Sequence, residues 1–85
     1  MTDKELMDRA EGKLKGFGFD IKTVESTDKY TRKYTALYGE AGEVQVVVDL
    51  GYSFTWITIC WGPSTIIGIN NRTGKFRIHG NVRIW

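Results

Sequence analysis

Basic side chains recur at alternate positions near the C-terminal end of the chain. The series comprises Lys75, Arg77, His79 and Arg83, and Trp85 closes it. Alternate side chains of an extended strand share one face and stand roughly 6–7 Å apart, close to the spacing of successive phosphates along a nucleic-acid strand, and a Trp ring can stack on a base. The pattern indicates an anionic partner. The alternative is a solvated sheet face, or an edge strand that its charges protect from aggregation.

The distribution of charge along the chain supports an anionic partner. The net charge is only +2, but all ten acidic residues lie at or before Asp49, together with eight Lys and Arg residues. Residues 50–85 carry four Lys and Arg residues and no acid. The net positive charge therefore lies in the segment that contains the alternating basic series.

A second group of candidate contact residues lies in the middle of the chain. Tyr30, Arg32 and Tyr34 alternate along one predicted strand. Tyr and Arg are common in binding hot spots, and both can stack on bases. These side chains are exposed if the helix covers the opposite face of the sheet, and they pack in the core if it covers theirs. The sequence leaves both arrangements open.

Residues that could catalyse a reaction or bind a metal are sparse. His79 is the only histidine, and it has no carboxylate or nucleophile beside it in the sequence. Cys60 is the only cysteine, and its apolar neighbours predict a buried thiol on a strand. The glycines stand singly at turns and do not form a phosphate-binding loop. We therefore expect no enzyme activity, no cofactor and no metal site.

The sequence also indicates the cellular compartment of the protein. The chain does not open with a basic segment followed by an apolar one, and its apolar stretches have the length of strands. A single cysteine cannot form an internal disulfide, which fits a reducing compartment. We expect a cytoplasmic protein that does not bind membranes.

One helix is predicted at the N-terminus. Thr2 and Glu5 have the spacing of a capping box, and an apolar stripe follows at helical spacing through Leu6, Met7, Ala10 and Leu14. We expect the helix to end near Lys15, with Gly16 as its left-handed C-terminal residue.

Alternating side chains predict β-strands for the remainder of the chain. The expected strands cover residues 17–25, 30–38, 44–50, 52–61, 65–69 and 75–85, with a polar turn at 26–29 and a hairpin loop at 70–74. The strand 52–61 is apolar on both sides and is expected to be central and covered on two faces. A hairpin at Gly80 and Asn81 would mix apolar and charged residues on each face, so one long strand bent at Gly80 is favoured.

These elements predict an α+β fold, with one N-terminal helix packed on a five- to six-stranded antiparallel sheet in a single domain over residues 1–85. The leading hypothesis is a non-enzymatic interaction module that binds a macromolecular partner, with a protein favoured, through a sheet face or edge, and so modulates or inhibits it. Compact inhibitors of the phage or mobile-element type share this size and class, which is an analogy only.

Two other functions stay open at this point. The first is nucleic-acid binding through the basic series, either as a monomer or as a homodimer that doubles the basic area. The second is binding of a small ligand at an oligomer interface lined by Trp56, Trp61 and Trp85.

Overall fold

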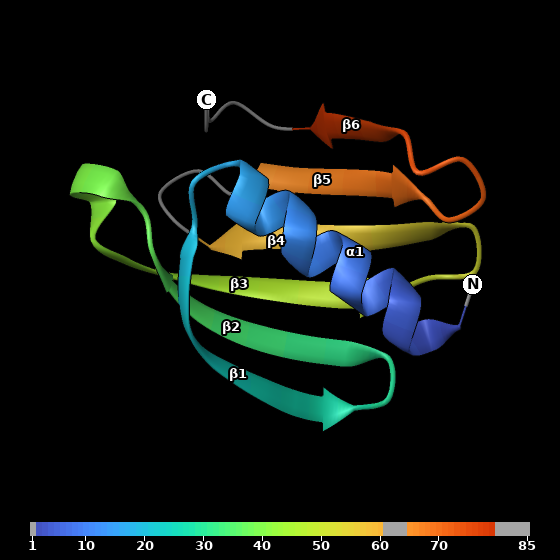
Figure 1. The fold of residues 1–85 in the computed structure, drawn as a ribbon, viewed down its shortest axis with the longest axis horizontal. Coiled ribbons are helices and arrows are strands. Elements are labelled where there is room, and N and C mark those ends of the chain that lie inside the picture. The colour runs from blue at the N-terminus through green and yellow to red at the C-terminus, as the bar shows by residue number, and fades with distance from the viewer. Residues whose placement is uncertain (1, 61–64, 80–85) are drawn as a thin grey trace.

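The computed structural model describes residues 2–60 and 65–79, and Figure 1 shows how they are arranged. The elements are α1 (Asp3–Gly16), β1 (Asp20–Asp28), β2 (Thr31–Leu37), the short 3-10 helix η1 (Gly39–Ala41), β3 (Glu43–Leu50), β4 (Phe54–Cys60), β5 (Thr65–Asn70) and β6 (Phe76–His79). The helix α1 lies across one face of a six-stranded antiparallel sheet (Figure 1). This arrangement confirms the predicted α+β fold. No helix among the described residues is long and apolar enough to span a membrane.

The N-terminus of α1 carries the predicted capping box. Thr2 Oγ1 accepts a hydrogen bond from the Glu5 amide at 3.2 Å, and Glu5 Oε1 accepts one from the Thr2 amide at 3.1 Å. The backbone hydrogen bond from Thr2 lowers the pKa of Glu5, because it stabilises the charged carboxylate. The helix ends at Gly16, and the left-handed glycine is Gly18, with a φ of 99°, instead of Gly16. Phe17 has right-handed backbone angles, so the left-handed residue comes two positions later than predicted.

The strands form a meander in which each strand pairs with the next, from β1 to β6. The predicted turn at 26–29 is wrong, because β1 continues through Asp28 and the turn narrows to Lys29 and Tyr30. The Tyr30 amide donates a hydrogen bond to Asp28 Oδ1 at 2.7 Å, which closes this tight turn.

The outer strand β1 is poorly suited to pairing with another chain. Its register against β2 shifts between Ile21 and Thr23 and again between Ser26 and Asp28. Its residues are mostly exposed, and they include charged side chains such as Lys22. Bulges and charges on an edge strand oppose the addition of a further strand. The faces of the sheet are therefore more suitable surfaces for a partner than this edge.

The core lies between α1 and the sheet. The helix contributes Met7, Ala10 and Leu14, and the sheet contributes Tyr34, Ala36, Val44, Val46, Val48, Ile57, Ile59, Ile67 and Ile69. These positions alternate along each strand, as was predicted for the inward face of β3. The side chains between them point away from α1, and we call the side of the sheet that they form the open face.

The strand β4 is internal as predicted, but only one of its faces is covered. Ile57 and Ile59 face α1 and are buried, whereas Phe54 and Trp56 on the open face are 38% and 37% exposed. The thiol of Cys60 is exposed too, so the prediction that it is buried is wrong. One helix can cover only one face of a sheet, which leaves the second apolar side of β4 on the surface.

The alternation predicted for the C-terminal strand is confirmed over the part that the structure describes. Ile78 is half-buried against the core and pairs with Ile67, while Arg77 and His79 lie on the open face. Residues 80–85, and with them the bend predicted at Gly80 and the predicted roles of Arg83 and Trp85, lie outside the described residues.

Candidate functional site

A groove runs along β5 on the open face, between the side chains of β4 and those of β6. It has a volume of about 650 Å³ and is lined by Phe54, Trp56, Gly68, Asn70, Thr73, Lys75, Phe76, Arg77 and His79. The strand register explains its shape, because Trp56, Gly68 and Arg77 stand in one row across the three strands. Gly68 has no side chain, which leaves room for the Trp56 ring to lie over β5. We call this feature the open-face groove.

Trp56 and Phe54 form one wall of the groove. A Cβ atom at Gly68 would lie only 2.8 Å from Cζ3 of Trp56, so the six-membered ring of the indole lies over that glycine. The five-membered ring approaches Gly51, whose Cβ would lie 3.3 Å from the indole nitrogen. The Trp56 ring is 5.4 Å from the Phe54 ring and 6.3 Å from the His79 ring, measured between centroids. Phe54 and Trp56 thus form an exposed aromatic wall, and the His79 ring approaches Trp56 from the β6 side of the groove.

Lys75, Arg77 and His79 form the opposite wall. They lie across β5 from the aromatic wall, at a backbone separation of about 9–10 Å, which is two strand spacings. Among the residues that the structure describes, no carboxylate lies within salt-bridge distance of Lys75 or Arg77. These two cations are therefore available to an anion from outside the protein.

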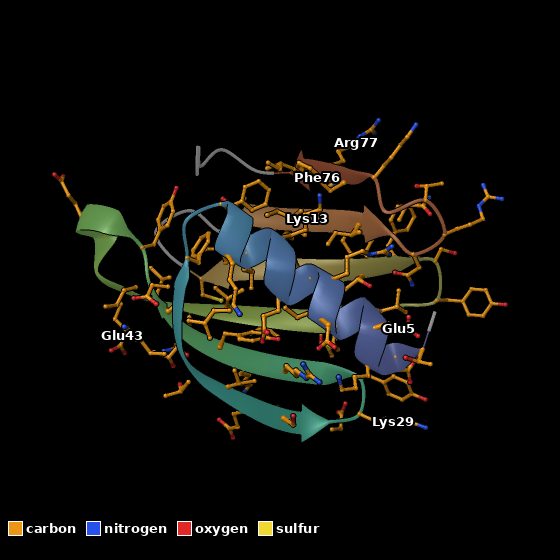
Figure 2. All side chains as sticks on the ribbon, viewed as in Figure 1. Glu5, Lys13, Lys29, Glu43, Phe76 and Arg77 are labelled. Atoms are coloured by element: carbon orange, nitrogen blue, oxygen red, sulfur yellow. The ribbon has the colours of Figure 1, made fainter. Side chains whose placement is uncertain are left out.

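The other side of β6 is held by α1 and the segment after it. The Phe76 ring contacts the Phe17 ring edge to face at 5.5 Å, and Lys13 Nζ lies 4.8 Å from the centre of the Phe76 ring. Figure 2 shows Lys13 and Phe76 together on the helix side, with Arg77 extending from β6. These contacts fix the strand that presents the cationic wall.

The hairpin loop between β5 and β6 is held in place by polar contacts. The Asn71 side chain accepts a hydrogen bond from Thr55 Oγ1 at 2.6 Å and donates one to the Gly51 carbonyl at 3.0 Å. Arg9 of α1 donates to the carbonyls of Asn70 and Asn71, at 3.2 Å each. Gly74 ends the loop with a φ of 77°, as predicted for this hairpin. The loop therefore sets the position of β6 relative to Trp56.

The half of the open face formed by β1 to β3 has a different character. Its polar side chains bond to one another across the strands, because Thr31 Oγ1 donates to Asp49 Oδ1 at 3.0 Å and the Gln45 amide donates to Thr35 Oγ1 at 3.2 Å. Lys33 stands opposite Glu25 in the register, which places opposite charges side by side. In this half, the side chains of Thr31, Asp49, Thr35 and Gln45 have hydrogen-bond partners within the protein.

The second predicted contact group does not form a surface. Tyr34 is 0% exposed and lies under α1, so the structure corrects its proposed contact role. Arg32 is half-buried on the same side, with Nη1 3.8 Å from Asp8 Oδ1, and only Tyr30, at the end of its strand, is well exposed. Burial raises the pKa of the Tyr34 hydroxyl, and its oxygen has no hydrogen-bond partner within the described residues. The helix covers the face of β2 that carries Tyr34, whereas the sequence of β2 allowed either of its faces to be the covered one.

The structure thus brings together part of the predicted site and adds residues that the sequence did not single out. Lys75, Arg77 and His79 share one wall, as predicted. Phe54 and Gly68 were not predicted, and Trp56 was considered only as a lining residue of an oligomer interface. The apolar pattern on both sides of β4 was the available signal, since one helix cannot cover both.

The described residues offer no assembled catalytic or metal site. Cys60 and His79 both lie on the open face, but β5 separates them, and Cys60 pairs with Gln45 whereas His79 pairs with Ile66. Across residues 2–60 and 65–79, no three His, Cys, Asp or Glu side chains gather closely enough to hold a metal ion. The chemistry that the groove does support is stacking on a planar group and pairing with an anion.

Comparison with known proteins gives no relative. The chain matches no protein-family model, no curated protein sequence and no solved structure at a significant level.

Proposed function

We propose that this protein is a non-enzymatic interaction module that binds a macromolecular partner through the open-face groove. The observation that carries the proposal is the exposure of Phe54 and Trp56 beside Lys75 and Arg77, which have no carboxylate partner within residues 2–60 and 65–79, on a face that α1 leaves uncovered. Exposed aromatic surface rimmed by polar groups is typical of an interaction site, and Trp and Arg dominate the energetics of such sites.

Several features support a preorganised contact surface. The Trp56 ring already lies over Gly68, and the loop that positions β6 is tied to α1 and to the turn before β4. Little conformational entropy is then lost when a partner binds, which favours affinity. Occupying the partner's surface is sufficient to modulate or inhibit it, and no reaction is required.

The test is affinity capture from native lysate with the wild-type protein and variants, read out by quantitative mass spectrometry. Trp56→Ala removes the centre of the aromatic wall, and Tyr52→Ala is the matched control because Tyr52 is a fully exposed aromatic residue outside this groove. We expect one or more macromolecules to be recovered by wild type and Tyr52→Ala and lost with Trp56→Ala. Equal recovery by all three proteins would refute a role for the groove.

A further inference from the structure

We infer that the partner of the open-face groove is single-stranded nucleic acid, bound with its bases on the aromatic wall and its phosphates on the cationic wall. The inference rests on the proposed function and names the class of partner. It starts from the juxtaposition of Phe54 and Trp56 on one side of β5 with Lys75, Arg77 and His79 on the other.

The aromatic wall has the geometry that unpaired bases need. The centres of the Phe54 and Trp56 rings lie 5.4 Å apart, so both rings can meet bases of one extended strand. Aromatic side chains on the open face of an antiparallel sheet are a recurrent platform for stacking two or three bases. The rings of a duplex are already stacked on one another, so this wall selects for single strands.

The cationic wall has the spacing that a phosphate backbone needs. Lys75, Arg77 and His79 alternate along one strand direction, with Cα atoms roughly 6–7 Å apart. The 36 residues from Leu50 to Trp85 contain no acid, so the segment that carries this wall adds no like charge that would repel a phosphate. Arg77 can also bind a phosphate through two parallel hydrogen bonds.

The two walls together favour a nucleic acid over an acidic protein segment. A nucleotide joins a planar ring to an anion, and the groove offers stacking surface on one side and cations on the other. A chain of Asp or Glu residues would meet the cations of Lys75 and Arg77 but has no ring to place against Trp56. A nucleic acid therefore uses both walls of the groove, whereas a purely acidic segment uses only one.

The experiment measures fluorescence anisotropy of a labelled oligothymidylate of about 12 nucleotides, a length within the range that one sheet platform covers. We expect saturable binding at low salt, and weaker binding to a duplex of equal length. Loss of stacking in Trp56→Ala should lower the affinity by about fivefold to 150-fold, since one stacked base contributes roughly 1–3 kcal/mol. Tyr52→Ala should bind as the wild type does.

Salt dependence tests the second wall. With two phosphate contacts, from Lys75 and Arg77, the affinity should fall by about sevenfold between about 50 mM and 200 mM salt, from a slope of about −0.7 per contact. Arg77→Ala should reduce that slope by about 0.7. The matched control is Lys29→Ala, which removes an exposed cation from the turn between β1 and β2 and should leave the slope unchanged.

Three outcomes separate this inference from the proposed function. Absence of oligonucleotide binding up to about 100 µM protein at low salt overturns the inference, because that is the weak limit of non-specific nucleic-acid affinity. If capture from lysate then recovers a nuclease-resistant protein that depends on Trp56, the module binds a protein and the proposed function stands. If nothing recovered depends on Trp56, both proposals fail.

Discussion

The two halves of the open face are built from the same kind of antiparallel strand but carry opposite chemistry. On β1 to β3, polar side chains bond to their neighbours, as Gln45 does to Thr35 and Thr31 does to Asp49. On β4 to β6, the aromatic wall faces Lys75 and Arg77, which have no carboxylate partner among the described residues. Groups satisfied within the protein gain little from a partner, whereas exposed rings and unpaired cations gain both contacts and charge neutralisation.

The halves also differ in how firmly they are tied to the rest of the fold. The β5–β6 loop is bonded to Arg9 of α1 and, through Asn71, to the turn before β4. The outer strand β1 has two register shifts and little burial. The unmatched chemistry therefore lies beside a loop that polar contacts anchor to the helix and to the turn before β4, which helps to hold a binding site in position.

The largest effect is expected from breaking the loop that supports the groove. Asn71→Ala leaves the Thr55 hydroxyl and the Gly51 carbonyl without the partner they have now. We expect the free energy of unfolding to fall by about 3 kcal/mol, at the upper end for part-buried polar groups that lose their bonds. Urea unfolding followed by circular dichroism measures it. Thr35→Ala, which removes an exposed bond in the polar half, should cost no more than about 0.5 kcal/mol, and equal costs would contradict the comparison.

Charge reversal at matched positions tests whether the two halves differ in binding. Arg77→Glu places an acid in the cationic wall, and we expect oligonucleotide affinity to fall by at least about tenfold at low salt, as one contact is lost and repulsion is added. Lys33→Glu makes the same change on the polar half, where we expect less than about a twofold effect because charges there act over a longer, screened distance. Anisotropy titrations of both variants give the answer. Similar losses would mean that only net charge matters.

A smaller effect is expected from displacing Trp56 without changing it. A methyl group at Gly68 would lie 2.8 Å from the indole, so Gly68→Ala must displace the Trp56 ring from its position over residue 68. We expect about a fivefold loss of oligonucleotide affinity, the low end for one stacked base. Gly12→Ala is the control, because its Cβ would meet no atom within 4 Å and a helix interior favours Ala over Gly. An unchanged affinity in Gly68→Ala would show that the ring position is unimportant.

The smallest effect concerns the covered side of the sheet. Burial raises the pKa of Tyr34, so the folded state holds its hydroxyl neutral. The associated stability is complete below the ordinary tyrosine pKa of about 10 and is lost as the pH rises from there through the raised pKa of the folded state. Tyr34→Phe should change stability by less than about 1 kcal/mol at neutral pH, because the hydroxyl oxygen has no hydrogen-bond partner among the described residues. The same substitution should also reduce the loss of stability above about pH 10. Urea unfolding at neutral and alkaline pH measures both effects. If Tyr34→Phe lost as much stability at alkaline pH as the wild type does, the attribution of that loss to Tyr34 would be wrong.

Local patterns allowed most of the fold to be predicted. The helix start at Thr2, its apolar stripe and the hairpin glycine at Gly74 each depend on interactions within a few residues. The alternation of Arg77 and His79 with Phe76 and Ile78 likewise follows from the two-residue period of a strand. Errors occurred where a local signal was ambiguous, as in the polar stretch 26–29, which has the composition of a turn and continues as the bulged edge of β1.

The candidate site could be predicted only in part. The sequence alone determined that every acidic residue precedes residue 50, that Lys75, Arg77 and His79 share a face, and that β4 has two apolar sides. Only the tertiary structure decided that α1 covers Tyr34 and leaves Trp56 uncovered, and that Gly68 lies opposite Trp56. Alternation marks two faces of a strand without saying which one a helix will cover, because that choice depends on how residues far apart in the chain pack against one another.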